Sequence, residues 1–198
     1  STSIWLCCIT GIQVGYMYSQ YYYLNNYKES LPKYQKNALT LCVGLWYSRS
    51  IISFWTFHGQ RNWSPKMVIF FSFIILPILT FPQQIFSQPL KVDKYHIYNK
   101  TALSLYIFGS IIHTIYELNR HLFKSNPNNK GKLYTSGLAS LTRNPNYLGD
   151  VILWCGWSMF SGNYKITMLP LYVLYNFISK LIPEKETYLS DKYGKEWT

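Results

Sequence analysis

Long apolar runs recur along the chain, separated by short polar segments. The clearest run, residues 67–86, is about as long as a helix that crosses a hydrocarbon core, and it contains no charged residue. Runs of this kind predict membrane-spanning helices near residues 3–24, 38–57, 67–86, 101–119, 147–162 and 165–182. The pattern therefore predicts an all-α, polytopic membrane protein with about six transmembrane helices.

Two of the predicted spans carry a charged residue. Arg49 lies inside 38–57, and Asp150 lies near the start of the short run 147–162. Taken singly, each of these runs also suits a buried helix of a soluble protein. Six such runs in 198 residues leave too little amphipathic sequence to cover them in water. An integral membrane protein is therefore the favoured interpretation.

Composition excludes a disordered basic tail. Hydrophobic residues make up 48% of the chain and aromatic residues 19%, so much of it must be buried despite a net charge of +11. The mean hydropathy of −0.04 suggests a soluble chain. The 19 tyrosines and seven tryptophans lower that mean, yet both residue types favour membrane interfaces. Tyrosines cluster between residues 16 and 27, where the first predicted span leaves the bilayer.

The positive charges are spread over the loops between the predicted spans. Lysine and arginine are more frequent on the side that carries the loop 120–146, which places this loop on the cytoplasmic side. They form no stripe of the kind that a nucleic-acid-binding face needs. The expected partners are therefore membrane lipids and not nucleic acid. The four cysteines lie within predicted spans without metal-ligand spacing, so no metal site is predicted.

Polar residues of the second half gather at predicted helix ends. Arg120 and Lys124 are four residues apart and share one face of a helix that leaves the membrane. The sequence Asn-Pro-Asn-Asn at 126–129 breaks that helix, and Pro145 suits the first turn of the next one. His113 lies on an apolar helical face, where we interpret it as a hydrogen-bonded packing histidine.

Asn146 and Asp150 are one helical turn apart, so both side chains can face one cavity. An acid just inside a span is costly unless it has a partner or a water-filled pocket, which makes Asp150 a candidate functional residue. The alternative is an interfacial acid paired with Arg143. For Arg120 and Lys124, contacts with a cofactor and contacts with lipid headgroups are both open.

Four motifs follow one another in the second half of the chain. They are FKSNP at 123–127, RNPNYLGD at 143–150, Trp-Ser at 157–158 with Gly162, and KYGKEW at 192–197. Their order and spacing resemble the C-terminal half of the membrane sterol reductases, a group that includes the lamin B receptor. Looser forms occur in steroid 5-alpha-reductases, and isoprenylcysteine and phospholipid methyltransferases share part of the pattern. This divides the chain into N-terminal transmembrane helices (1–108) without a clear match and a reductase-like domain (109–198).

The resemblance implies an integral membrane reductase that transfers a hydride from NADPH to a double bond of a sterol, steroid or enoyl lipid. NADPH would lie between the last helices of a protein in a membrane such as the endoplasmic reticulum. Tyr147 and Asp150 would be the catalytic residues, which orient the nicotinamide or relay a proton. The cofactor-binding residues would be Arg120, Lys124, Arg143, Asn146, Tyr193 and Trp197.

Departures from the sterol reductase pattern leave two alternatives open. The histidine of the family's Arg-His-Pro step is Asn144 here, and a basic run expected before Lys-Tyr-Gly is replaced by LIPEKE at 181–186. The two added negative charges would repel a phosphorylated cofactor. Glu184 and Glu186 instead resemble the methyltransferases, in which they would contact the amine of S-adenosylmethionine. One alternative, the lower-ranked of the two, is therefore a lipid or isoprenylcysteine methyltransferase that uses S-adenosylmethionine.

The higher-ranked alternative is a non-catalytic accessory subunit of a larger membrane complex, such as a respiratory complex of the mitochondrial inner membrane. The lost basic run and the unmatched residues 1–108 favour it, since a descendant without activity need not keep either.

Overall fold

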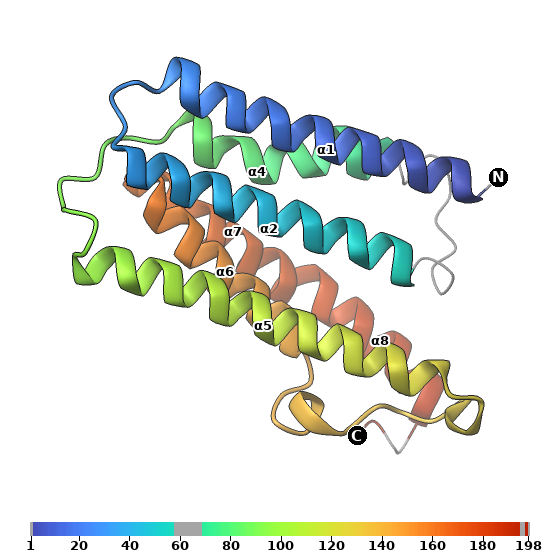
Figure 1. Cartoon of the computed structure of the whole chain (residues 1–198). Coiled ribbons are helices and arrows are strands. Elements are labelled where there is room, and N and C mark those ends of the chain that lie inside the picture. Colours follow the sequence, from blue (N-terminus) through green and yellow to red (C-terminus); the bar gives the residue numbers. More distant parts are fainter. Residues whose placement is uncertain (1, 58–68, 195–196, 198) are drawn as a thin grey trace. The chain divides into compact units, whose positions relative to one another are not determined.

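The computed structural model describes residues 2–57, 69–194 and 197, and within these ranges the chain forms helices and turns without a strand (Figure 1). The elements are α1 (Thr2–Tyr27), α2 (Lys33–Phe57), η2 (Phe71–Ile75), α4 (Leu76–Ile85), α5 (Ile97–Ser125), η3 (Pro127–Asn129), η4 (Gly137–Ser140), α6 (Pro145–Phe160), η5 (Tyr164–Thr167), α7 (Met168–Asn176), η6 (Phe177–Leu181) and α8 (Ile182–Tyr193). The all-α prediction is confirmed for these ranges. All six predicted runs are helical there, and residues 67–68 of one run lie outside the described residues.

The chain divides into two compact units. Unit 1 combines residues 1–103 with the later segment 157–166, and unit 2 combines residues 104–156 with 167–198. Two long helices, α5 and α6, contribute to both units because the divisions fall within them.

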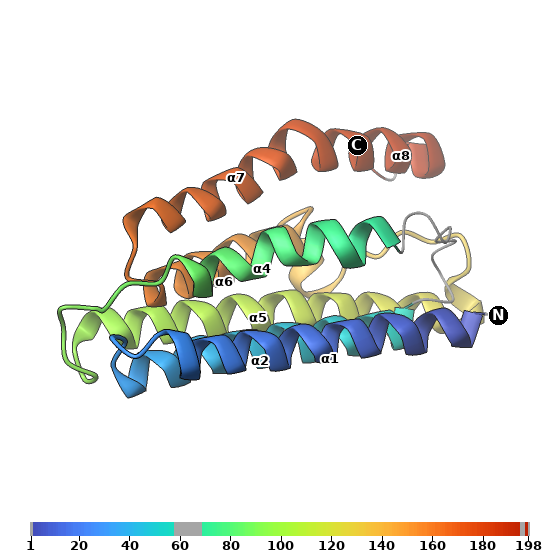
Figure 2. The same cartoon turned by 90° about the horizontal axis from the view of Figure 1, so that it is seen from above.

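Unit 1 is built on α1, α2 and α4, which lie side by side (Figures 1 and 2). Its interior is unusually rich in uncharged polar side chains. The Gln20 amide donates to Thr80 Oγ1 at 3.0 Å, and Gln13 donates to Ser50 Oγ at 3.2 Å, linking α1 to α4 and to α2. Gln13 and Gln20 are both at most 1% exposed. These hydrogen bonds satisfy the amide nitrogens, whereas the Oε1 atoms of both glutamines are buried without a hydrogen-bond partner among the described residues.

The segment 157–166 completes unit 1. The Trp157 ring lies 6.5 Å from that of Trp46 on α2, and the Gln35 amide donates to the carbonyls of Gln88 (2.7 Å) and Phe160 (2.8 Å). Gly162 has a φ of +66° and packs against the Gln88 carbonyl, so a side chain there would meet both a disfavoured backbone and a backbone atom. Residues from the second half of the chain therefore form part of the first unit's core.

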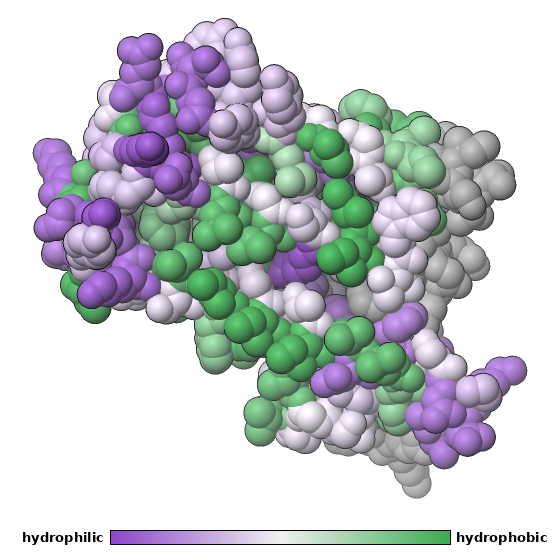
Figure 3. Space-filling view, viewed as in Figure 1, coloured by the Kyte–Doolittle hydropathy of each residue, from purple (hydrophilic) through white to green (hydrophobic). Residues whose placement is uncertain are grey.

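The outward-facing surfaces of the helices are apolar. On α5, the exposed residues Ile111, Ile115, Leu118 and Leu122 recur at helical spacing, and this stripe is visible in Figure 3. Buried amides together with many large exposed apolar side chains are unusual for a soluble domain, and a lipid environment favours this combination.

One described helix, the continuous run Tyr164–Tyr193, is both long enough and apolar enough to cross a bilayer. It combines η5, α7, the π-helical turn η6 and α8, and its charged residues concentrate in α8. The prediction of about six transmembrane helices is therefore not confirmed, although helices occupy all six predicted positions.

Candidate functional site

The predicted site residues all belong to unit 2, where local sequence signals set the helix ends. α5 ends at Ser125, and the Asn126 side chain accepts a hydrogen bond from the backbone N–H of Asn128 at 3.0 Å. α6 begins at Pro145, whose fixed φ suits a first helical turn. The predicted helix break at 126–129 and the start at Pro145 are both confirmed.

Two glycines allow α5 and α6 to approach each other closely. A Cβ atom on Gly149 would lie 2.7 Å from the Gly109 carbonyl oxygen and 2.8 Å from the backbone nitrogen of His113. No side chain fits at these distances, so the crossing requires glycine. It brings the middle of α5 against the turn of α6 that carries Asn146 and Asp150.

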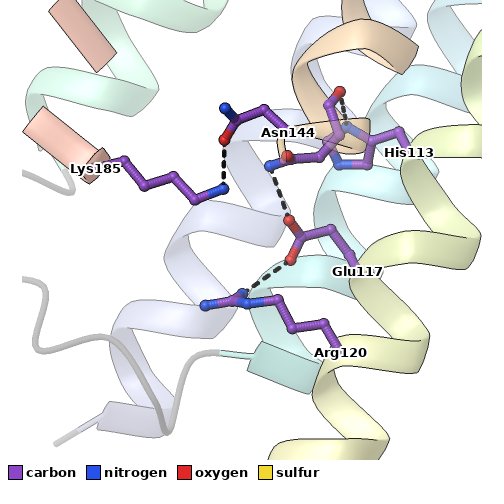
Figure 4. Close-up of polar contacts among 6 residues, drawn as sticks. His113, Glu117, Arg120, Asn144 and Lys185 are labelled. Atoms are coloured by element: carbon purple, nitrogen blue, oxygen red, sulfur yellow. Dashed lines mark hydrogen bonds and ion pairs between the residues drawn. The ribbon is translucent and has the colours of Figure 1, made fainter. Parts of the chain in front are cut away.

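The face of α5 opposite its apolar stripe carries polar residues at positions 113, 117, 120 and 124. Among them, Glu117 is a carboxylate only 7% exposed. Its Oε1 accepts from the Asn146 amide at 3.0 Å, and its Oε2 accepts from the Arg120 guanidinium at 3.4 Å (Figure 4). A buried carboxylate is tolerable only when paired in this way.

His113 lies one helical turn before Glu117 and faces α6. Its Nδ1 lies 2.9 Å from Asp150 Oδ1 and 3.3 Å from the backbone oxygen of Asn146. The structure therefore agrees with a hydrogen-bonded histidine at this position. It also gives Asp150 the partner that an acid inside a helix bundle requires. We name His113, Glu117, Arg120, Asn146 and Asp150 the α5–α6 polar cluster.

One atom of this cluster is buried without a protein partner. Asn146 uses its amide nitrogen for Glu117, whereas its side-chain oxygen is inaccessible and has no hydrogen-bond partner among the described residues. A buried acceptor left in this state costs free energy, typically about 1–3 kcal/mol. A ligand donor at Asn146 would remove that cost.

α8 supplies a second set of contacts. The Lys185 ammonium donates to the Asn144 side-chain oxygen at 2.7 Å (Figure 4) and lies 5.3 Å from the centre of the Tyr147 ring. Tyr147 also stacks on Phe177, with ring centres 4.4 Å apart. Asn144, which replaces the histidine of the sterol reductase pattern, thus serves as a hydrogen-bond partner of α8.

The remaining predicted residues meet further along α8. Arg143 forms an ion pair with Glu186 at 3.0 Å and lies over the Trp197 ring, while the Trp197 indole donates to Glu186 at 2.8 Å. Lys124 donates to the Tyr193 hydroxyl at 2.9 Å.

Gly194 ends α8 with a φ of +54°, a backbone conformation that favours glycine at a helix end. Residues 195–196 of the motif KYGKEW lie outside the described residues.

The sequence interpretation missed Glu117 and Lys185 and underrated His113. The signal for Glu117 was present, because it lies four residues after His113 and three before Arg120 on one helical face. Lys185 lies between Glu184 and Glu186, and nothing in its sequence neighbourhood indicates a contact with Asn144. Its contact with Asn144 depends on how α8 packs, which spacing along the chain does not reveal.

Charges of both signs are nearly balanced in these contacts. The cations are Arg120, Lys124, Arg143 and Lys185, and the carboxylates are Glu117, Asp150 and Glu186. The four positive and three negative charges give a net charge of +1 when His113 is counted as neutral. Two of the cations are already engaged by carboxylates, Arg120 by Glu117 and Arg143 by Glu186. The arrangement suits a ligand that itself carries both signs better than a strongly anionic one.

Comparisons with known proteins point to one family. A family model described as "Protein of unknown function (DUF1295)" matches residues 49–182, a range that contains the whole α5–α6 polar cluster and ends at the start of α8. No solved structure gives a significant match to the chain.

The similar curated proteins carry methyltransferase names. "Probable protein-S-isoprenylcysteine O-methyltransferase" of Oryza sativa subsp. indica is 29% identical over 157 residues, which is 71% of this chain and 78% of that protein. "Probable O-methyltransferase ustE" of Ustilaginoidea virens is 33% identical over 100 residues, 49% of this chain and 35% of that protein. "Protein-S-isoprenylcysteine O-methyltransferase" of Schizosaccharomyces pombe is 28% identical over 108 residues, 52% of this chain and 46% of that protein. The chain thus spans between a third and a half of the last two relatives.

These names fit the methyltransferase alternative. The predictions of NADPH, of an oxidoreductase and of a mitochondrial complex receive no support from the comparisons.

Proposed function

We propose, from the premise that this chain belongs to the DUF1295 family within the steroid 5-alpha-reductase-like superfamily, that it is a membrane methyltransferase. It would transfer the methyl group of S-adenosylmethionine to an oxygen of a lipid-like acceptor. The observation that carries the proposal is the similarity to an isoprenylcysteine O-methyltransferase over 71% of this chain and 78% of that relative.

The charges of unit 2 support this cofactor over NADPH. S-adenosylmethionine carries an ammonium, a carboxylate and a sulfonium, so it presents both signs of charge. NADPH carries several phosphate charges of one sign, and two of the four cations predicted or found near the site are already paired with carboxylates. A site with near-balanced charges complements the first ligand better.

Individual residues fit the parts of S-adenosylmethionine. Glu117 and the unpartnered side-chain oxygen of Asn146 are acceptors for its ammonium group. Lys185 is a donor for its carboxylate. The faces of Tyr147 and Trp197, each already beside a cation, suit the sulfonium or the adenine ring. Glu186 is engaged by Arg143 and Trp197, so it would act by holding them.

When bound, the sulfonium supplies an electrophilic methyl group to the acceptor oxygen. The task of this chain is to fix donor and acceptor in line and to exclude water from them.

Cofactor binding tests the proposal directly. Purified protein in phospholipid nanodiscs is titrated by calorimetry with S-adenosylmethionine and, separately, with NADPH. Binding of S-adenosylmethionine alone is expected. Binding of NADPH alone would restore the reductase interpretation, and binding of neither would favour the non-catalytic subunit.

The variant Asn146→Ala localises the site. It is expected to weaken S-adenosylmethionine binding by about 10-fold, the usual value of a hydrogen bond to a charged group. Asn176→Ala is the matched control, because Asn176 is an asparagine of unit 2 that bonds only the Tyr172 carbonyl one turn away. Equal affinities of the two variants would remove Asn146 from the site.

A further inference from the structure

The His113–Asp150 pair has the geometry of a proton-accepting dyad. One ring nitrogen, Nδ1, lies 2.9 Å from the carboxylate, and the two side chains are 18% and 19% exposed. They are therefore sheltered from bulk water but still within reach of a ligand.

The carboxylate sets the tautomer of the ring. An ionised Asp150 accepts a hydrogen bond from Nδ1–H, and the backbone oxygen of Asn146 is a second acceptor on the same side. The proton on the neutral ring is thus held at Nδ1, which leaves the lone pair at Nε2. No group in the described part of the chain contacts Nε2, so it is available to a ligand.

The position of this dyad relates it to the proposed methyl-transfer site. His113 lies one turn from Glu117 on the polar face of α5, and its Asn146 contact joins the same α6 residue that Glu117 binds. The Gly149 crossing holds the backbone of His113 against α6, so the ring has little freedom to move away. A proton acceptor is thereby fixed beside Glu117 and Asn146, the two residues of the cluster that we assign to the cofactor.

Methyl transfer to a carboxylate does not require a proton acceptor. An S-isoprenylcysteine offers a carboxylate, which is already deprotonated at neutral pH and reacts without losing a proton. A neutral alcohol or phenol must lose its hydroxyl proton as the methyl group arrives, and a positioned base assists that loss.

We propose that the acceptor of this protein is a lipid with a neutral hydroxyl group, and that His113 takes the hydroxyl proton at Nε2 during methyl transfer. This rests on the proposed methyltransferase function. The oxygen–methyl bond forms as the sulfur–methyl bond breaks, and the bonding electrons return to sulfur. The hydroxyl proton passes to His113 and then to water, so the products are a lipid methyl ether and S-adenosylhomocysteine.

The experiment compares hydroxyl and carboxylate acceptors in nanodiscs with S-adenosyl-[methyl-³H]methionine. The hydroxyl probes are 4-nonylphenol, farnesol and cholesterol, and the carboxylate probe is N-acetyl-S-farnesylcysteine. Alkaline treatment releases volatile methanol from a methyl ester but leaves a methyl ether intact. Alkali-stable label in at least one hydroxyl probe is expected.

Two variants connect ether formation to the dyad. His113→Asn keeps an N–H donor for Asp150 but removes Nε2, and Asp150→Asn reverses the hydrogen bond so that Nε2 carries the proton. Each is expected to lower ether formation about 100-fold or more, while S-adenosylmethionine still binds by calorimetry. His96→Asn, in an exposed loop of unit 1, is the control and is expected to retain activity.

Label in the ester alone, or in no probe, from wild-type protein that binds S-adenosylmethionine would overturn the hydroxyl proposal. Ether formation by a His113→Asn protein at the wild-type rate would overturn the role of His113. Failure of wild-type protein to bind S-adenosylmethionine would instead refute the methyltransferase function itself.

Discussion

The interiors of the two units both contain polar side chains, but of different kinds. In unit 1 the fully buried polar residues are neutral amides and hydroxyls, of which Gln20, Thr80 and Tyr47 form one set of hydrogen bonds, and the charged side chain of Arg49 also reaches this interior with a buried Nη1. In unit 2 they are charged or titratable, and Glu117 and Asp150 each have a partner from the facing helix. Neutral hydrogen bonds between helices stabilise packing at modest cost, whereas buried charges are retained mainly where chemistry uses them. The difference agrees with the proposal that unit 2 carries the chemistry and that the polar residues of unit 1 serve packing.

The largest effect is expected from Gly149→Ala, which should destabilise unit 2 and leave unit 1 folded. Its added methyl group would meet the Gly109 carbonyl and the His113 nitrogen, both of which are backbone atoms that cannot move independently. We expect a loss of about 3 kcal/mol or more in the free energy of unfolding. Cys155 of unit 2 should then be alkylated much faster, while Cys42, which is fully buried in unit 1, stays protected. Residue-resolved mass spectrometry after thiol alkylation measures both.

Gly44→Ala on α2 is the matched control, because nothing lies within 4 Å of a Cβ atom at Gly44. It is expected to stabilise the protein by about 0.5–1 kcal/mol. Equal alkylation rates at Cys155 in the two alanine variants would contradict the close crossing.

Glu117→Gln is expected to have the next largest effect, and on ligand binding more than on stability. The substitution keeps the size of the side chain but removes the charge that balances Arg120 and would meet the cofactor's ammonium. We expect S-adenosylmethionine affinity to fall roughly 10- to 100-fold, as calorimetry would show. Glu29→Gln, on the exposed turn after α1, should bind like the wild type. Unchanged affinity of the Glu117 variant would place the cofactor elsewhere.

Gln20→Leu tests the structural side of the comparison. Removing the amide loses its bonds to Thr80 and Tyr47, yet Thr80 Oγ1 keeps the Leu76 carbonyl as a partner. The expected loss is about 1 kcal/mol in a denaturant titration in mixed micelles, with S-adenosylmethionine affinity unchanged. A clear loss of affinity would show that the polar interior of unit 1 serves the ligand as well.

The smallest effect is expected at the Arg143–Glu186 ion pair, whose side chains are 55% and 30% exposed. A double-mutant cycle with Arg143→Gln and Glu186→Gln should give a coupling free energy below about 1 kcal/mol, because solvent screens exposed pairs. A larger coupling would mean that these residues, together with Trp197, are shielded from water as part of the site.

Local signals in the sequence predicted the helix ends well. Pro145 and the Asn-Pro step at 126–127 act on their own backbone, so their effects do not depend on the rest of the fold. The polar face of α5 could be predicted in part, since Arg120 and Lys124 share it. The hydrogen-bond partners of its residues could not be predicted, because the contact of Glu117 with Asn146 depends on how closely α5 and α6 pack. The apolar runs predicted helices correctly. They also predicted six membrane-spanning helices, whereas one described helix is long and apolar enough to be identified as a span.

The resemblance to sterol reductases identified the right superfamily, but the family match begins at residue 49, well before the resemblance at 109, and the NADPH cofactor is not supported. In this chain the motif RNPNYLGD contains the start of α6 at Pro145. Which cofactor binds depends instead on how the neighbouring charges pair, and the pairing of Arg143 with Glu186 joins residues 43 positions apart.

Completion of unit 1 by residues 157–166 has a consequence for biosynthesis. Trp157 and Phe160 are supplied to Trp46 and Gln35 only after more than fifty intervening residues of the other unit have been made. During synthesis, the core of unit 1 therefore stays incomplete until the segment 157–166 has been made. Chaperones and insertion machinery would meet this half-built state during every round of synthesis.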